Sequence, residues 1–179
     1  SSPIESLNFS LTEMATRTYQ IMSTLYYLHV YFRDNSNFDK FNLEKNNLQW
    51  AIQSNLLRIP DSWVLSKLQL VIKEVGSAFG KCRFHEGAKS IEEFIINTLS
   101  QTYVPVTRNE IWDDSLETLP RRLAIYSVLG YVLKQVDIML HPLSPYISDF
   151  LYLACFPDKK SILLEDWPVY NENLINKQT

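Results

Sequence analysis

Glycine is scarce in this chain, with only 4 among 179 residues. This scarcity disfavours glycine-rich phosphate-binding loops and folds built on many tight turns. The two cysteines, Cys82 and Cys155, are too few and too far apart for a disulfide framework or a zinc knuckle, and they are compatible with a reducing cytoplasm. A net charge of −3 does not indicate a strong general nucleic-acid binder. No signal peptide is visible, and the most apolar window, 21–32, is too short to cross a bilayer.

What the chain does contain is apolar residues at helical spacing. Its composition is 46% hydrophobic and its length suits one domain. Apolar side chains recur every three or four residues, which is typical of amphipathic helices. The sequence therefore predicts an all-α fold, an antiparallel helix bundle of four to five main helices. We expect these helices at about 11–33, 61–80, 86–112, 120–140 and 146–156.

Several helix boundaries are marked by polar residues, proline and glycine. Ser10 and Glu13 have the spacing of a capping box at the start of the first helix. Gly80 is expected to end the second helix. Pro105 lies inside the third and should kink or end it, because proline lacks the N–H that a helix interior needs.

Catalytic motifs are not visible in the sequence. Residues 85–89, His-Glu-Gly-Ala-Lys, begin like a zinc-binding His-Glu-x-x-His motif, but Lys89 stands where the second ligand is needed. The three histidines are far apart in sequence, so neither a metal cluster nor a catalytic triad is indicated. We therefore expect this chain alone not to be an enzyme, with no catalytic and no metal-binding residues.

Four short motifs follow one another along the chain. Residues 61–68 read Asp-Ser-Trp-Val-Leu-Ser-Lys-Leu, and residues 97–104 read Asn-Thr-Leu-Ser-Gln-Thr-Tyr-Val. Residues 140–152 contain the corner His-Pro-Leu-Ser-Pro, and residues 161–168 read Ser-Ile-Leu-Leu-Glu-Asp-Trp-Pro. In this order and spacing they resemble the anticodon-binding region of class Ia aminoacyl-tRNA synthetases, most of all isoleucyl-tRNA synthetase of the archaeal and eukaryotic type. The resemblance extends over about residues 17–168.

The resemblance implies a function for the chain and for a larger parent enzyme. The chain would bind the anticodon stem-loop of tRNA(Ile) and contact the catalytic domain of the parent synthetase, with no DNA or membrane partner. The parent would attach isoleucine to tRNA(Ile) in the cytoplasm with ATP and Mg²⁺, whereas this chain would hold no cofactor. Residues 1–168 would form the bundle, as one domain of the larger enzyme, and residues 169–179 a C-terminal tail or linker.

The chain also departs from the family pattern. The family has basic residues where this chain has Gln101, Pro105 and Arg108, whose spacing places them on one helical face. Only Arg108 keeps its charge. The family's tryptophan is replaced by Thr102, and its first-helix asparagine by Tyr27.

Candidate RNA-binding residues come from positive charge, aromatic rings and hydrogen-bonding groups. Residues 58–108 carry seven Lys or Arg and five Asp or Glu, so positive charge gathers in the second and third predicted helices. An anticodon loop is largely single-stranded and is read by stacking and by hydrogen bonds to base edges. We expect tRNA to be bound by Tyr27, Trp63, Lys67, Ser100, Gln101 and Arg108. Further stacking candidates are Tyr31, Tyr103 and Trp112.

Two alternatives stay open from the sequence. The chain could be a helical protein-interaction module, which the acidic balance and the departures at Tyr27, Thr102 and Pro105 favour. It could also be the equivalent domain of a valyl- or leucyl-tRNA synthetase, because the Pro-x-x-Pro corner is shared among these enzymes.

Overall fold

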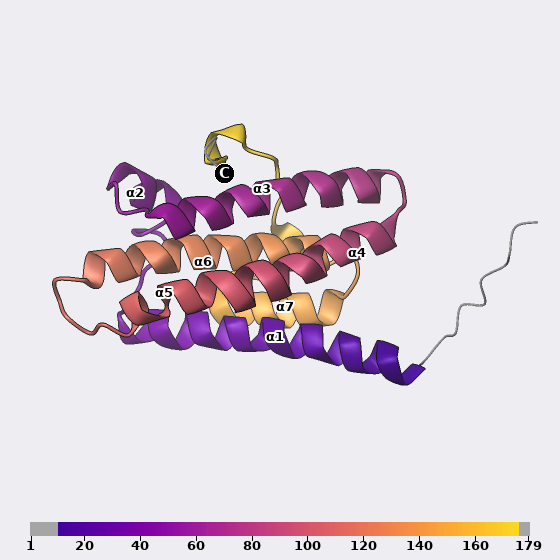
Figure 1. Ribbon diagram of the computed structural model, residues 1–179, viewed down its shortest axis with the longest axis horizontal. Helices are drawn as coiled ribbons and strands as arrows, with labels where there is room; N and C mark the ends of the chain where they lie inside the picture. The colour runs from indigo at the N-terminus through magenta and orange to yellow at the C-terminus, as the bar shows by residue number, and fades with distance from the viewer. Residues whose placement is uncertain (1–10, 176–179) are drawn as a thin grey trace, which may run out of the picture.

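Helix α6 (Leu119–Leu140) runs through the middle of the molecule, a computed structural model that describes residues 11–175. Figure 1 shows α3 on one side of α6 and α1 and α7 on the other, with the rod that contains α4 and α5 passing in front. Contacts join α6 to each of these helices. The other elements are α1 (Leu11–Phe38), α2 (Leu48–Gln53), α3 (Ile59–Gly80), α4 (Phe84–Glu93), the π-helix η1 (Phe94–Tyr103), α5 (Val104–Ile111), α7 (Pro145–Cys155) and the 3₁₀ turns η2 (Ile162–Leu164) and η3 (Glu172–Leu174).

The all-α prediction is confirmed. Residues 11–175 contain no β-strand, and the five long helical pieces lie within a few residues of their predicted ranges. The predicted apolar stripes form one buried core, which includes Leu25, Leu28, Phe32, Leu65, Leu68, Ile72, Val75, Ile91, Ile95, Leu99, Leu129, Leu133 and Val136. The capping box at Ser10 and Glu13 lies outside the described part of the chain.

Helix α6 also contains a long, strongly apolar window. By length and composition alone it is able to cross a membrane, but 78% of its most apolar 18-residue window is buried inside the protein. The predicted apolar window at 21–32 belongs instead to α1, which buries only one face. Burial on all sides explains the apolar composition of α6, because a helix surrounded by other helices needs no polar face.

Pro105 does not end the third helical rod. Helix α4, the π-helix η1 and helix α5 follow one another without a break, and Pro105 lies in the first turn of α5. Directly before it the Val104 N–H donates to the Leu99 carbonyl, five residues back. This wider spacing is that of a π-helix, a form that interrupts α-helices and often does so at functional sites. Pro105 therefore lies where the rod returns from π-helical to α-helical hydrogen bonding.

The chain after α7 packs against α3. The Ser66 hydroxyl donates to the Leu174 carbonyl at 3.2 Å, and the Asn171 N–H donates to the Gln69 side chain at 2.8 Å. These contacts reach Leu174, next to the last described residue. A domain boundary after Pro168 stays a prediction.

Candidate nucleic-acid interface

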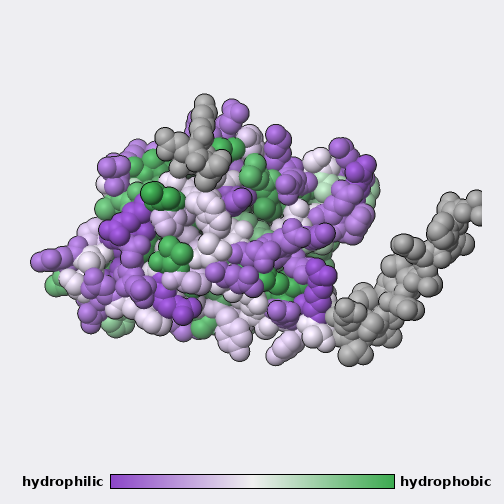
Figure 2. All heavy atoms as spheres, in the orientation of Figure 1, coloured by the Kyte–Doolittle hydropathy of each residue, from purple (hydrophilic) through white to green (hydrophobic). Residues whose placement is uncertain are grey.

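Four elements, α1, α3, η1 and α5, carry all six predicted RNA-binding residues, and η1 contacts each of the other three. The rod α4–η1–α5 contacts α3 on one side and α1 on the other (Figure 1). Figure 2 shows this face as a mixture of hydrophilic and hydrophobic side chains. We call the surface formed by α3, η1, α5 and α1 the rod face.

Helix α3 contributes Trp63 and Lys67. Trp63 is partly buried against the core, and the Lys67 ammonium lies 6.0 Å from the centre of its ring. Lys67 is exposed and lines a groove of about 290 Å³ between α3 and the rod, where Asn97 and Thr98 form the opposite wall. The structure therefore brings Lys67 next to η1.

The same groove also contains carboxylates. Glu74 and Glu93 line it together with Lys67, and Glu74 accepts a hydrogen bond from the Ser90 hydroxyl at 3.0 Å. The groove is of mixed charge, so charge alone does not make it an anion site.

The π-helix η1 carries Ser100 and Gln101. Gln101 is exposed and Ser100 half-buried, so both side chains lie at the surface of the rod. Thr102, which replaces the family's tryptophan, turns its hydroxyl back to donate to the Asn97 carbonyl at 2.7 Å. Its hydroxyl is therefore used within the rod.

Arg108 and Tyr31 lie close together where α5 passes α1. The Arg108 guanidinium lies 5.5 Å from the centre of the Trp112 ring, a cation–π contact at the surface. Burial raises the pKa of the Tyr31 hydroxyl, and the nearby positive charge of Arg108 opposes part of that rise. Trp112 is 63% exposed, so one helical end presents an arginine and an aromatic ring to solvent.

Tyr27 lies on α1, one helical turn before Tyr31. Its side chain is 66% exposed, and its ring meets that of Tyr26 edge-on at 5.5 Å. Within residues 11–175, no hydrogen bond or ring contact joins Tyr27 to another of the six candidates. The assignment of all six residues to RNA stays a prediction.

The prediction of Tyr103 as a stacking residue is wrong. Its side chain is 1% exposed, and its hydroxyl donates to the Asp61 carboxylate at 2.8 Å. Burial and the negative charge of Asp61 raise the pKa of Tyr103 well above its ordinary value. Its aromatic ring belongs to the core, since every face of a fully buried ring is already in contact with protein.

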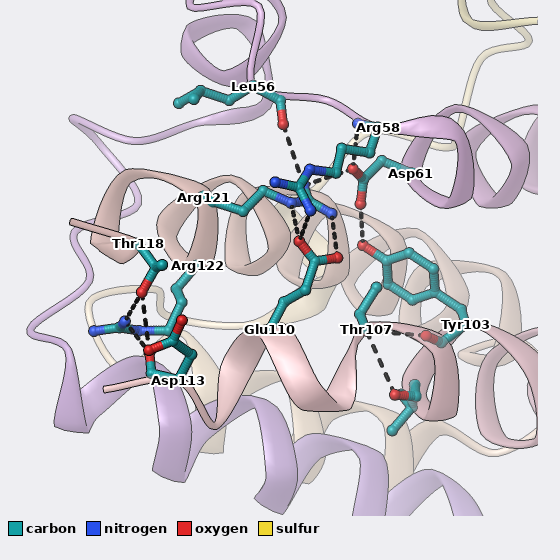
Figure 3. A network of polar contacts seen from close by, with 11 residues as sticks. Leu56, Arg58, Asp61, Tyr103, Thr107, Glu110, Asp113, Thr118, Arg121 and Arg122 are labelled. Carbon is teal, nitrogen blue, oxygen red and sulfur yellow. Dashed lines mark hydrogen bonds and ion pairs between the residues drawn. The ribbon is translucent and has the colours of Figure 1, made fainter. Parts of the chain in front are cut away.

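Asp61, the first residue of the 61–68 motif, lies at the centre of a buried polar network (Figure 3). It caps the start of α3 by accepting from the Arg58 N–H at 2.7 Å, and it pairs with the Arg121 guanidinium at 2.6 Å. Arg121 also pairs with Glu110 at 2.9 Å, and Glu110 in turn pairs with the Arg58 side chain at 2.6 Å. Figure 3 shows Arg121 between the two carboxylates. The motif therefore joins α3, α5 and α6, and Arg58 is held by Glu110.

A second network holds the next residue of α6. Arg122 binds both carboxylate oxygens of Asp39 at 2.8 Å, and the Tyr126 hydroxyl donates to Asp39 at 2.7 Å. The hydrogen bond from Arg122 holds the pKa of Asp39 below its usual value. Arg122 also donates to the Ser115 carbonyl at 2.9 Å, which fixes the loop between α5 and α6.

Sequence periodicity predicts neither network, although one signal points to them. Arg121 and Arg122 stand side by side at the start of a long, mostly buried helix, where an unpaired charge is very unfavourable. Two adjacent arginines there indicate buried carboxylate partners. Periodicity does not say which carboxylates these are, because Asp39 and Asp61 lie 83 and 60 residues away in sequence and Glu110 belongs to another helix.

Candidate ligands for a metal do not come together. In the described part of the chain, no three side chains of His, Cys, Asp or Glu are placed to hold an ion. His85, which begins the zinc-like sequence, is exposed at the start of α4.

Comparison with known proteins identifies the fold's relatives. Residues 61–179 match the family described as "Anticodon-binding domain of tRNA ligase". The isoleucine–tRNA ligase of Methanocella arvoryzae is 34% identical over 145 residues, which cover 78% of this chain and 13% of that protein. The Clostridium tetani ligase is 31% identical, and the match covers 99% of this chain and 17% of that protein. The Methanopyrus kandleri ligase is 26% identical, and the match covers 98% of this chain and 16% of that protein.

The chain thus spans about one sixth of the length of these relatives, which come from archaea and from a bacterium. The family match covers the 61–68 motif, the corner at 141–145 and the 161–168 motif, and the relatives extend the likeness to α1. The resemblance to the isoleucyl enzymes is therefore confirmed, and the chain belongs to the anticodon-binding domain family of tRNA ligases.

Proposed function

We propose that this chain binds the anticodon arm of tRNA(Ile) through its rod face, as one domain of an isoleucine–tRNA ligase. The parent enzyme would join isoleucine to tRNA(Ile) in the cytoplasm with ATP and Mg²⁺, bound by residues outside this chain. The names of the relatives and the family match support this proposal. The part of this chain in the reaction would be to position the tRNA, because binding energy far from the reacting ends orients them.

The observation that carries the proposal is the state of Arg108. The side chains of Arg58, Arg121 and Arg122 each pair with a carboxylate, whereas Arg108 has no carboxylate within ion-pair distance in residues 11–175. Its guanidinium is instead oriented by the ring of Trp112 and stays exposed. An arginine held in this way is available to a phosphate of the RNA backbone, for which its planar fork of donors is well suited.

The other candidates offer further contacts around Arg108. Tyr27 offers an exposed ring on which a base of the loop would stack. Gln101 offers a donor and an acceptor for a base edge. Lys67, across the groove from Asn97, would add a second phosphate contact.

A salt titration with a matched pair of charge variants tests the proposal. Binding of the whole chain to fluorescent tRNA(Ile) would be measured by anisotropy at several salt concentrations. We expect Arg108→Ala to weaken binding about 10-fold and to lower the slope of log K against log salt by about one, as the loss of one phosphate contact requires. Lys160→Ala, which removes the same charge from the segment after α7, should change neither quantity.

Two results would count against the proposal. The first is an absence of salt-sensitive binding by the unaltered chain at low ionic strength. The second is an equal loss of affinity for Arg108→Ala and Lys160→Ala, which would mean that only overall charge matters. Footprinting of the bound tRNA should show protection of the anticodon arm.

A further inference from the structure

The main-chain carbonyl of Ser100 has lost both of its helical hydrogen-bond donors. In an α-helix its donor would be the Val104 N–H, but that group donates to the Leu99 carbonyl. In the π-helical register of η1 the donor would be residue 105, which is a proline and has no N–H. Pro105 is also the α-helical partner of the Gln101 carbonyl.

A carbonyl without a helical donor needs another partner. Main-chain acceptors are almost always satisfied, by side chains, by water or by a ligand. No side-chain donor within the described residues reaches the Ser100 carbonyl. Two hydroxyls that follow it along the rod are used elsewhere, since Thr102 donates to the Asn97 carbonyl and Thr107 to the Tyr103 carbonyl.

The residues around this carbonyl lie on the rod face. Ser100 is half-buried, and the residues beside it on the outer side of the rod, Gln101 and Pro105, are exposed. One turn further along the same face is Arg108 with its Trp112 ring. The register change thus places a free acceptor between an exposed amide side chain and the arginine that we assign to phosphate.

We propose that the Ser100 carbonyl accepts a hydrogen bond from the exocyclic amino group of an unpaired base of the anticodon loop, and that Pro105 is the residue that frees it. This inference rests on the proposed function and adds a base contact to it. Adenine, guanine and cytosine carry such an amino group, and uracil does not. A fixed carbonyl therefore discriminates between bases, which a phosphate contact does not do.

Pro105→Ala is the variant that tests this, because it returns an N–H to the position facing the two carbonyls. Anticodon stem-loops would be prepared in which one amino group at a time is removed, with purine riboside for adenosine, inosine for guanosine and zebularine for cytidine. We expect one removal to weaken binding to the unaltered chain about 5-fold, the size of one neutral hydrogen bond. In Pro105→Ala that same removal should have no effect, and the unmodified RNA should bind about 5-fold more weakly.

Val106→Ala is the matched control, since Val106 is exposed beside Pro105 and already has its own N–H. It should respond to the amino removal like the unaltered chain. Hydrogen exchange gives a second measurement without RNA: the new N–H of Pro105→Ala should be protected, because it donates to the freed carbonyl. Equal helix content by circular dichroism would show that the variant is folded.

The outcomes separate this inference from the proposed function. If the chain binds the stem-loop in a salt-sensitive way, but removal of no amino group changes the affinity, the base contact is overturned and the proposed function stands. The base contact is also overturned if removal of the amino group lowers the affinity of Pro105→Ala as much as it lowers the affinity of the unaltered chain. An unaltered chain that does not bind the stem-loop at all would overturn both.

Discussion

The Arg121 guanidinium of α6 lies 2.6 Å from the Asp61 carboxylate of α3, and Asp61 is fully buried. The aspartate that begins the 61–68 motif is thus a structural residue. It ties the start of α3 to the central helix and accepts from the Tyr103 hydroxyl of η1 as well. This one carboxylate therefore links α3 and η1, two elements of the rod face, to the central helix α6.

Removing this carboxylate should be strongly destabilising. In Asp61→Ala the buried Arg121 loses one of two carboxylates and the Tyr103 hydroxyl loses its acceptor. We expect the free energy of unfolding to fall by about 3 kcal/mol, because a buried charge is left with incomplete compensation. Urea unfolding followed by circular dichroism measures this change. Arg58→Ala removes an ion pair whose arginine side chain is 62% exposed and should cost no more than about 1 kcal/mol.

Gly130 provides a test of close packing in the core. A Cβ at this position in α6 would lie 2.8 Å from the Phe32 ring of α1, which is itself packed against Phe41 and Phe156. We expect Gly130→Ala to lower the free energy of unfolding by about 1–3 kcal/mol, because the ring has no room to move. Gly76→Ala in α3 meets nothing closer than 4.0 Å and should instead raise stability by up to about 1 kcal/mol. Thermal melts of both variants measure these changes in stability. An equal change in melting temperature for the two variants would contradict the packing explanation.

The helices could be predicted from the sequence because their signals are local. The spacing of Leu65, Leu68 and Ile72 encodes one buried face of α3, and Pro60 and Gly80 lie close to its two ends. These features depend on neighbouring residues only, so that periodicity and capping are enough to find them.

The buried networks and the π-helix could not be predicted in the same way. The partners of Arg121 and Arg122 lie up to 83 residues away, and their choice depends on the tertiary arrangement. Pro105 indicated an interruption of the rod, but whether proline ends, kinks or re-registers a helix depends on the packing around it. The prediction that Tyr103 stacks on RNA is wrong for a similar reason, because amphipathic spacing does not say which aromatic ring faces the core.

His29 and Asp137 should make stability depend on pH. The two side chains are buried and joined by a hydrogen bond of 2.8 Å between Nε2 and Oδ2, and Nδ1 lies 2.8 Å from the Leu25 carbonyl. Burial disfavours the charged imidazole, but the Asp137 carboxylate and the two acceptors outweigh it and raise the pKa of His29 above 6.5. Burial likewise raises the pKa of Asp137 above 3.8, although the charge of His29 opposes it.

The folded protein therefore binds protons more tightly than the unfolded chain at both groups. The contribution of His29 to stability is fully present below about pH 6.5 and is lost as the pH rises through its higher folded pKa. We expect the free energy of unfolding to fall as the pH rises above about 6.5, by no more than about 1.4 kcal/mol per pH unit for this single proton. Cys155, whose pKa burial raises to about 12, keeps its proton in this range. Urea unfolding at several pH values should show the fall in the unaltered chain and in His85→Gln, whose histidine is exposed, and lose it in His29→Gln.

Tyr27 separates base stacking from charge on the rod face. Its ring is 66% exposed, and loss of a stacked aromatic costs about 1–3 kcal/mol per base, or about 5- to 150-fold in affinity. We expect Tyr27→Ala to weaken tRNA binding within that range and to leave the salt dependence unchanged, because no phosphate contact is lost. Tyr27→Phe keeps the ring and should bind almost as the unaltered chain does. Tyr19→Ala is the matched control, since Tyr19 is 75% exposed and lies two helical turns earlier on α1. If anisotropy titrations gave the same affinity for Tyr27→Ala and Tyr19→Ala, the α1 surface at Tyr27 would have no part in RNA binding, and the contact would have to lie on η1 and α5 alone.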